Sequence, residues 1–102
     1  MKVYLAGKIT GLDRSATVEK FNAAARILTD MSFDVLVPTV LPVLEELSYM
    51  DYLHICFAMI DVCDAVVFLP DWEQSQGAKL ERDYARRSNK KIWYYSELTS
   101  IK

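Results

Sequence analysis

The segment Ala65-Val66-Val67-Phe68-Leu69 is apolar throughout and ends directly before Pro70. A short run of this kind is typical of a strand buried on both faces, in the interior of a parallel sheet. Three other segments, 2–6, 33–37 and 91–95, are also rich in residues that favour strands. We therefore expect a parallel sheet of about four short strands, with residues 65–69 in its interior.

Segments with helical periodicity lie between these strands. After Ser15, or Thr17 as the alternative N-cap, apolar residues recur at helical spacing as far as Leu28. Residues 50–62 and about 75–88 have the same character, whereas residues 39–47 show no regular pattern. Strands that alternate with helices predict right-handed crossovers. The expected fold class is α/β, a three-layer Rossmann or flavodoxin-like fold with helices on both faces of the sheet.

Length and composition exclude several classes of protein. A chain of 102 residues provides one hydrophobic core, so we expect a single domain over residues 1–102. Apolar runs stay below the roughly 18 residues of a membrane span, and the N-terminal apolar stretch is too short for a signal peptide. Two cysteines, Cys56 and Cys63, are too few for a disulfide framework or a zinc site. We expect a cytoplasmic protein with no metal and no cofactor.

The net charge of −2 averages three unlike segments. Residues 1–26 carry +3 and residues 79–102 carry +4, whereas residues 27–78 contain nine acidic residues and no lysine or arginine. A protein that binds duplex nucleic acid needs a continuous basic surface, so the acidic middle argues against that partner. The basic ends could still hold a small anionic ligand.

Ligands on folds of this kind bind beyond the carboxyl ends of the strands. This rule selects residues 7–14, 38–40, 70–78 and the residues after Tyr95. The third of these is the most informative, because Ser75-Gln76-Gly77-Ala78-Lys79-Leu80-Glu81 leads from a strand end into a helix. Backbone N–H groups at the start of that helix would bind an anion, with the Ser75 hydroxyl beside them.

Glu81 follows Gly77 by four residues, so both lie on one face of the expected helix. Glu81 could therefore face a ligand while Gly77 allows the ligand to approach closely. The alternative is that Ser75 only caps the helix and that Glu81 pairs with Lys79 or Arg82 in solvent.

An ordered set of motifs carries a family resemblance. The set consists of Tyr4-Leu5-Ala6-Gly7 with Ile9-Thr10-Gly11, then Val37-Pro38, then Cys63-Asp64-Ala65-Val66-Val67, and finally the segment from Ser75 to Glu81. In this order, over roughly residues 3 to 95, the motifs resemble the nucleoside 2-deoxyribosyltransferase superfamily. The chain looks most like the small phage and bacterial members of that superfamily.

The resemblance implies roles for particular residues. Glu81 corresponds to the nucleophilic glutamate, Tyr4 to the tyrosine that orients it, and Ser75 to the serine that holds a phosphate in the nucleotide hydrolases of the superfamily. In such enzymes the glutamate attacks C1′ of a deoxyribose, the base departs, and water or another base resolves the glycosyl-enzyme ester. The other substrate-binding positions that we expect are Gly7, Lys8, Ile9, Thr10, Gly77 and Ala78.

Two positions depart from the pattern of the superfamily. Its Gly-Pro after the first strand is Gly7-Lys8 here, and the Lys8 cation either holds a phosphate or is a solvated loop charge. The aspartate expected eight residues before Asp64 is Cys56. A thiol cannot replace a carboxylate at neutral pH unless its pKa is strongly lowered.

Other residues could supply the missing carboxylate. The candidates are Asp51, Asp61 and Asp71, and we favour Asp71 as a catalytic residue because it follows the third strand on the ligand side. Asp61 is expected at the opposite edge of the sheet. Trp72, in the same loop as Asp71, could stack on a base or sugar, or could be a packing residue.

Two functions are expected on these grounds, and a domain used mainly for assembly is a third possibility. The first is a nucleoside or nucleotide N-glycosidase or 2-deoxyribosyltransferase that acts through Glu81. The alternative is a catalytically inactive nucleotide-binding protein of the same fold, which would sense or sequester its ligand. The expected partner is a small nucleoside or nucleotide, and neither a long nucleic acid nor a membrane. Enzymes of the superfamily are oligomers in which a neighbouring subunit can complete the site, so we also expect a homo-oligomer.

Overall fold

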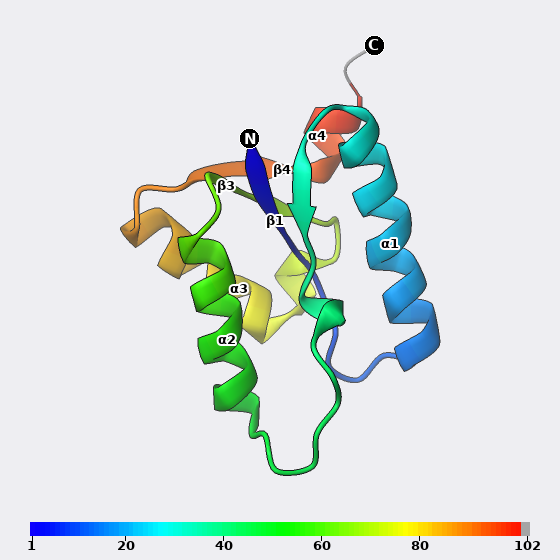
Figure 1. Cartoon of the computed structure of the whole chain (residues 1–102), viewed down its shortest axis with the longest axis vertical. Helices are drawn as coiled ribbons and strands as arrows, with labels where there is room; N and C mark the ends of the chain where they lie inside the picture. Colours follow the sequence, from blue (N-terminus) through cyan, green and yellow to red (C-terminus); the bar gives the residue numbers. More distant parts are fainter. Residues whose placement is uncertain (101–102) are drawn as a thin grey trace.

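Strands and helices alternate along residues 1–100, the part of the chain that the structure, a computed structural model, describes (Figure 1). The elements confirm the predicted α/β class. In chain order they are β1 (Lys2–Ala6), α1 (Arg14–Asp30), β2 (Asp34–Leu36), the 3₁₀ turn η1 (Pro38–Val40), α2 (Tyr49–Asp61), β3 (Ala65–Phe68), the 3₁₀ turn η2 (Trp72–Gln74), α3 (Gln76–Arg87), β4 (Lys91–Tyr94) and α4 (Tyr95–Thr99).

All strand pairs in the sheet are parallel, and the strand order is β2-β1-β3-β4. The two inner strands are β1 and β3, with Val3 opposite Ala65 and Ala6 opposite Phe68. Every residue of β3 is buried, as the apolar run predicts for an interior strand. From β1 the chain continues to β2 on one side of β1, and it then returns to β3 on the other side of β1. The connections therefore diverge between β1 and β3.

Two apolar layers cover the faces of the sheet. On one face Val3, Leu5 and Val67 pack against Phe21 and Leu28 of α1, with Leu98 of α4 beside them. On the other face Tyr4, Val66 and Phe68 pack against Ile60 of α2 and Ala85 of α3. Figure 1 shows α1 and α2 on opposite sides of the sheet. The predicted three-layer, Rossmann or flavodoxin-like arrangement is therefore confirmed.

The first helix begins earlier than either predicted N-cap. Asp13 caps α1, because its carboxylate accepts a hydrogen bond of 2.9 Å from the backbone N–H of Ala16. Thr17, one of the two predicted caps, is instead buried inside the helix and donates its hydroxyl to the Asp13 carbonyl at 2.7 Å. A carboxylate placed ahead of two hydroxyl residues competes well as a cap, since it is a strong acceptor in the positive field of the helix start.

The segment without regular pattern forms η1 and a loop over residues 41–48. A capping box begins α2: the Ser48 hydroxyl accepts from the N–H of Asp51, and the Asp51 carboxylate accepts from the N–H of Ser48. Arg14 donates to the carbonyls of Thr39 and Leu41, at 2.9 and 3.1 Å. The loop therefore has a defined path although it contains no regular element.

Tyr52 holds the middle of that loop. Its hydroxyl donates to the carbonyl of Pro42 at 2.8 Å and accepts from the N–H of Leu44 at 2.7 Å. No helix within residues 1–100 combines the length and the apolar character that crossing a bilayer requires.

Candidate active site

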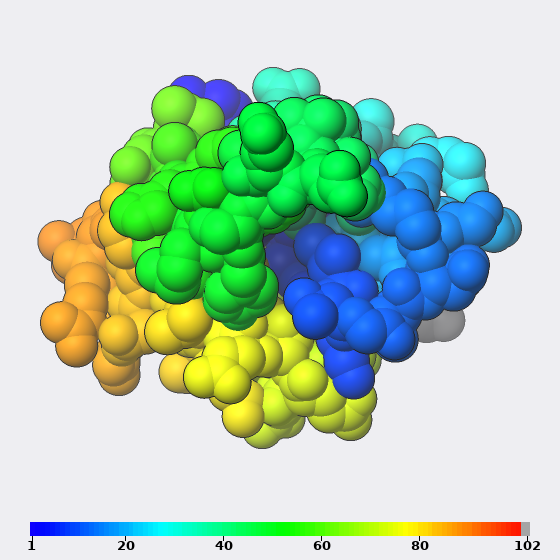
Figure 2. Space-filling model, turned by 90° about the horizontal axis from the view of Figure 1, so that it is seen from below, coloured from blue at the N-terminus to red at the C-terminus, as the bar shows by residue number. Residues whose placement is uncertain are grey.

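A cavity of about 360 Å³ opens at the carboxyl ends of β1 and β3, where the connections diverge. Its walls come from the loop after β1, η1 with the following loop, the first two turns of α2 and the start of α3. Figure 2 looks onto this end of the sheet. It shows a hollow between the blue β1–α1 loop, the green loop that leads into α2 and the yellow start of α3. Strand ends at a reversal of connections are where α/β sheets bind ligands.

Glu81 lines the floor of the cavity, and Tyr4 lies directly behind it in the core. Glu81 lies in the second turn of α3 and is only 6% exposed, and Tyr4 of β1 is fully buried. The Tyr4 hydroxyl donates to Oε2 of Glu81 at 2.5 Å, a short hydrogen bond between residues 77 positions apart. The alternative in which Glu81 pairs with Lys79 or Arg82 in solvent does not occur.

Burial controls the protonation of Glu81 and its neighbours. Loss of solvent raises the pKa of Glu81 to about 7, against the opposing effect of hydrogen bonds with Tyr4 and Cys56. Burial also raises the pKa of the Cys56 thiol to about 11, and it raises the pKa of Tyr4 with help from the Glu81 charge. Near neutral pH, Glu81 therefore exists in both forms, while Tyr4 and Cys56 remain protonated donors.

Two glycines let the loops close around the cavity floor. A Cβ atom on Gly7 would come within 2.9 Å of the Leu69 side chain. A Cβ atom on Gly77 would come within 3.0 Å of the Tyr49 hydroxyl and 3.9 Å of the Ser75 hydroxyl. Ser75 caps α3 by accepting from the N–H of Ala78 at 3.1 Å. Both hydroxyls therefore lie over the first turn of α3, where Gly77 leaves space for them.

Most of the residues predicted for the substrate site line this cavity. They come from two separate loops and from one helix face, which the strand order brings together. The predicted residues that line it are Gly7, Ile9, Thr10, Ser75, Gly77, Ala78 and Glu81.

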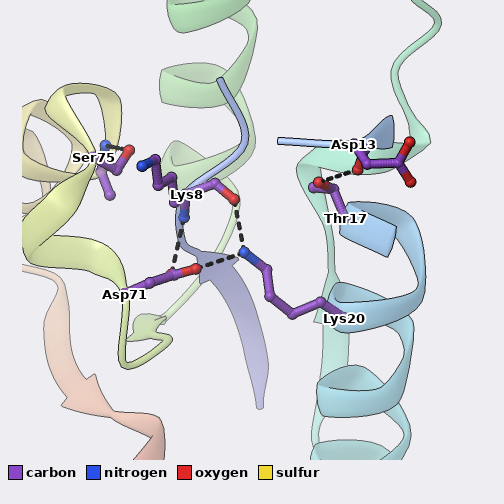
Figure 3. A network of polar contacts seen from close by, with 7 residues as sticks. Lys8, Asp13, Thr17, Lys20, Asp71 and Ser75 are labelled. Carbon is purple, nitrogen blue, oxygen red and sulfur yellow. Dashed lines mark hydrogen bonds and ion pairs between the residues drawn. The ribbon is translucent and has the colours of Figure 1, made fainter. Parts of the chain in front are cut away.

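Four predicted residues lie outside the lining: the buried Tyr4, and also Lys8, Asp71 and Trp72. Asp71 joins two loops, because its Oδ1 accepts from the N–H of Lys8 at 3.0 Å and its Oδ2 pairs with the Lys20 ammonium at 2.6 Å (Figure 3). Lys20 also donates to the Lys8 carbonyl at 2.8 Å. Asp71 is therefore committed to holding the β1–α1 loop against the loop after β3.

Trp72 is a packing residue in this structure. Its ring lies 5.5 Å from the ring of Phe68 and 5.8 Å from that of Tyr94, and the Arg82 guanidinium lies 5.3 Å from its centre. The Lys8 side chain extends from its loop toward Ser75 in the view of Figure 3.

The other two carboxylate candidates are also committed to structural hydrogen bonds. Asp51 belongs to the capping box of α2. Asp61, at the far end of that helix, accepts a hydrogen bond of 2.6 Å from the Tyr84 hydroxyl. Cys56, by contrast, lines the cavity and is close enough to Glu81 to lower the pKa of its carboxyl group.

Several residues of the cavity escaped the sequence analysis, above all Arg14, Tyr49 and Tyr52. The Ser48-x-x-Asp51 box was the signal that could have found two of them, because it starts the helix at Tyr49. Tyr49, Leu53 and Cys56 then follow at helical spacing and share one face of α2. The apolar wall was hidden in the irregular segment and consists of Leu41, Pro42, Val43, Leu44 and Leu47.

The cavity offers little charge of its own. Within the described residues 1–100, Arg14 and Glu81 are its only charged lining residues. The same residues contain no group of three or more histidine, cysteine or acidic side chains that could hold a metal ion. A ligand here meets aliphatic walls, tyrosine and serine hydroxyls, one guanidinium and one buried carboxyl group.

Comparison with known proteins gives a family match. Residues 1–94 match the family described as a domain of unknown function (DUF4406). No curated protein and no solved structure matches the chain at a significant level.

Proposed function

The chain belongs to the DUF4406 family, and for this member we propose a nucleoside or nucleotide N-glycosidase or 2-deoxyribosyltransferase activity with Glu81 as nucleophile. The observation that carries the proposal is the buried Glu81 carboxyl group on the floor of the cavity, held by the Tyr4 hydroxyl at 2.5 Å. A buried, oriented and titratable carboxyl group in a cleft is typical of a reactive site.

The geometry supports a division of labour between the two carboxylate oxygens. Tyr4 binds Oε2, so Oε1 is the oxygen that attacks C1′ of the sugar. The C1′–N bond breaks, its electron pair leaves with the base, and a glycosyl ester forms on Glu81. Water or a second base then attacks C1′ and releases the carboxylate.

The shape and lining of the cavity support a nucleoside as the ligand. A volume of about 360 Å³ lies in the usual range for small-molecule sites. The aliphatic wall that includes Leu41 and Leu44 suits a flat base, and the hydroxyls over Gly77 suit a sugar or its 5′-phosphate. A phosphate would also face the positive end of the α3 dipole.

The test is release of free base from the four 2′-deoxynucleosides and their 5′-monophosphates. We expect turnover of at least one substrate by the native protein and none by Glu81→Gln, which keeps the shape of the side chain. Glu97→Gln, on the exposed side of α4, is the matched control and should turn over normally. Full activity in Glu81→Gln would rule out the nucleophile assignment.

A second candidate function is binding without turnover. It is favoured by Cys56, whose thiol stays protonated at the position where the enzymes that this chain resembles have an aspartate. In that case a nucleotide should raise the melting temperature of the protein while no free base appears under any condition. Base release by the native protein excludes this candidate.

We also propose that the protein is cytoplasmic and forms a homo-oligomer. Cys56 and Cys63 are both free thiols, which suits a reducing compartment. Val40 and Val43 stand 65% and 75% exposed beside the cavity, and a neighbouring subunit would cover such side chains.

A further inference from the structure

A departing base needs a proton, and within residues 1–100 Glu81 itself is the only acidic residue that lines the cavity. Asp71 is bound by Lys8 and Lys20, Asp51 caps α2, and Asp61 lies at the far end of that helix. Cys56 is only 8% exposed, and burial beside Tyr4 raises the pKa of its thiol to about 11. A proton donor for the leaving group must therefore come from another residue of the cavity.

Tyr49 has the required position. It begins α2, lines the cavity, and places its hydroxyl within 3.0 Å of the point where a Cβ of Gly77 would lie. Glu81 follows Gly77 by one helical turn on the same face of α3, so the phenol and the carboxyl group face the same space from two helices.

The Tyr49 hydroxyl is also uncommitted. The Tyr4 hydroxyl is bound to Glu81, and the Tyr52 hydroxyl is bound to Pro42 and Leu44. Within the described residues 1–100, no hydrogen bond joins the Tyr49 hydroxyl to another residue. Tyr49 is 47% exposed and lines the cavity, so a ligand that enters the cavity can reach its side chain.

We propose that Tyr49 is the proton donor to the leaving base, an inference that rests on the proposed glycosidase or transferase function. As Glu81 attacks C1′, the electrons of the C1′–N bond pass to the base, whose nitrogen takes the Tyr49 proton. A tyrosinate remains. In the second half, the tyrosinate takes a proton from the attacking water or acceptor base, the ester bond breaks, and Glu81 leaves as carboxylate.

Electrostatics favours this order of events. Burial raises the pKa of Tyr49, and the Glu81 charge raises it further. Formation of the ester removes that charge, so the phenol becomes a stronger acid while the base departs. When the carboxylate is released in the second half, its charge makes the tyrosinate a better base.

The test compares two leaving groups on Tyr49→Phe. The natural substrate is the 2′-deoxynucleoside or monophosphate from which the native protein releases base, and the activated one is a 4-nitrophenyl 2-deoxyribofuranoside. Nitrophenolate leaves without protonation near neutral pH. We expect kcat for the natural substrate to fall about 10²- to 10⁴-fold, while kcat for the nitrophenyl glycoside and KM for both change only a few-fold.

Tyr84→Phe is the matched control, since it makes the same chemical change at the opposite end of the sheet, where the hydroxyl binds Asp61. It should leave both rates unchanged. Circular dichroism should show that both variants fold, because Tyr49 is half exposed at the first turn of its helix.

Two results overturn the assignment of Tyr49 alone. One is an unchanged rate of Tyr49→Phe on the natural substrate, and the other is an equal loss on both substrates, which would indicate substrate positioning. If the native protein releases no base, or if Glu81→Gln keeps full activity, the proposed function itself fails and Tyr49 has no such role.

Discussion

Glu81 is the residue at which function and stability are in conflict. A carboxyl group that is 6% exposed loses most of its hydration, and burial therefore raises its pKa to about 7. The protonated form is favoured in the folded chain, whereas a nucleophile must be ionised. The short hydrogen bond from Tyr4 partly restores the ionised form at the place where it would react.

This conflict predicts a pH-dependent gain of stability in Glu81→Gln. The pKa of Glu81 is about 7 in the folded chain against 4.5 for an ordinary glutamate, so the folded state binds the proton more tightly. The favourable contribution of this protonation is complete below pH 4.5 and is lost as the pH rises through 7. We expect Glu81→Gln to match the native protein at low pH and to exceed it by up to about 3 kcal/mol at pH 8.

Urea unfolding at pH 4.5 and pH 8 measures this difference in free energy of unfolding. Glu97→Gln changes an exposed residue and is the control. Its free energy of unfolding should differ from that of the native protein by the same amount at both pH values. A Glu81→Gln variant that is equally stable or less stable than the native protein at pH 8 would contradict the burial argument.

Tyr4 should control the pH at which Glu81 ionises. Tyr4→Phe removes a donor that stabilises the carboxylate, so the pKa of Glu81 should rise above 7. The acid limb of the pH–rate profile should move to higher pH. The carboxyl ¹³C chemical shift of Glu81 should also change with a midpoint at higher pH. Tyr84→Phe is the control, and a limb that stays in place in Tyr4→Phe would remove Tyr4 from this role.

At the scale of the element, the start of α3 has two functions in seven residues. Ser75 caps the helix with its oxygen lone pair, and its O–H remains free to bind a ligand oxygen. Gly77 then leaves room for the Tyr49 hydroxyl, and Glu81 completes the face one turn later. Capping and binding can coexist because they use different parts of one hydroxyl group.

A pair of Ser75 variants separates capping from phosphate binding. Ser75→Gly removes the hydroxyl at a loss of only a few tenths of a kcal/mol in capping, and Ser75→Asp keeps the cap but adds negative charge. We expect Ser75→Gly to weaken a 5′-monophosphate more than the matching nucleoside, and Ser75→Asp to abolish monophosphate binding while it spares the nucleoside. Calorimetric titration measures both, and equal weakening of the two ligands would exclude Ser75 from phosphate binding.

Periodicity located the elements better than it located their ends. Residues 65–69 could be assigned to the sheet interior because apolarity on both faces has one structural explanation. The start of α1 could not be assigned correctly, since Asp13, Ser15 and Thr17 are all good caps within one turn. The loop over 41–48 is held by Arg14 and Tyr52 through backbone carbonyls, and such bonds leave no periodic signal.

At the scale of the whole molecule, one side of the cavity consists of exposed apolar loop. Val43 is 75% exposed and Leu44 is 50% exposed, and both line the cavity. Side chains of this kind are typical of an interface or a ligand groove. A second copy packed on this loop would cover them and would narrow the mouth of the site.

We therefore expect Val43→Glu to disrupt self-association. A buried unpaired carboxylate at an interface is strongly unfavourable, so light scattering should show a single-chain mass for the variant and a larger mass for the native protein. Ile27→Glu is the control, because Ile27 is an exposed apolar residue of α1 that does not line the cavity. A native protein of single-chain mass would contradict the expected homo-oligomer.

Patterns within single elements were enough to predict the α/β class, the parallel sheet and the segment from Ser75 to Glu81 at a strand end. These properties follow from the spacing of apolar side chains and from the rule that parallel strands end at one edge. The partners of the polar residues depended on the tertiary structure. Tyr4 meets Glu81 across 77 positions and Asp71 meets Lys20 across 51, because strand order decides which loops face each other. The packing of α2 against α3 likewise places the Tyr49 hydroxyl over Gly77, where the absence of a side chain leaves room for it.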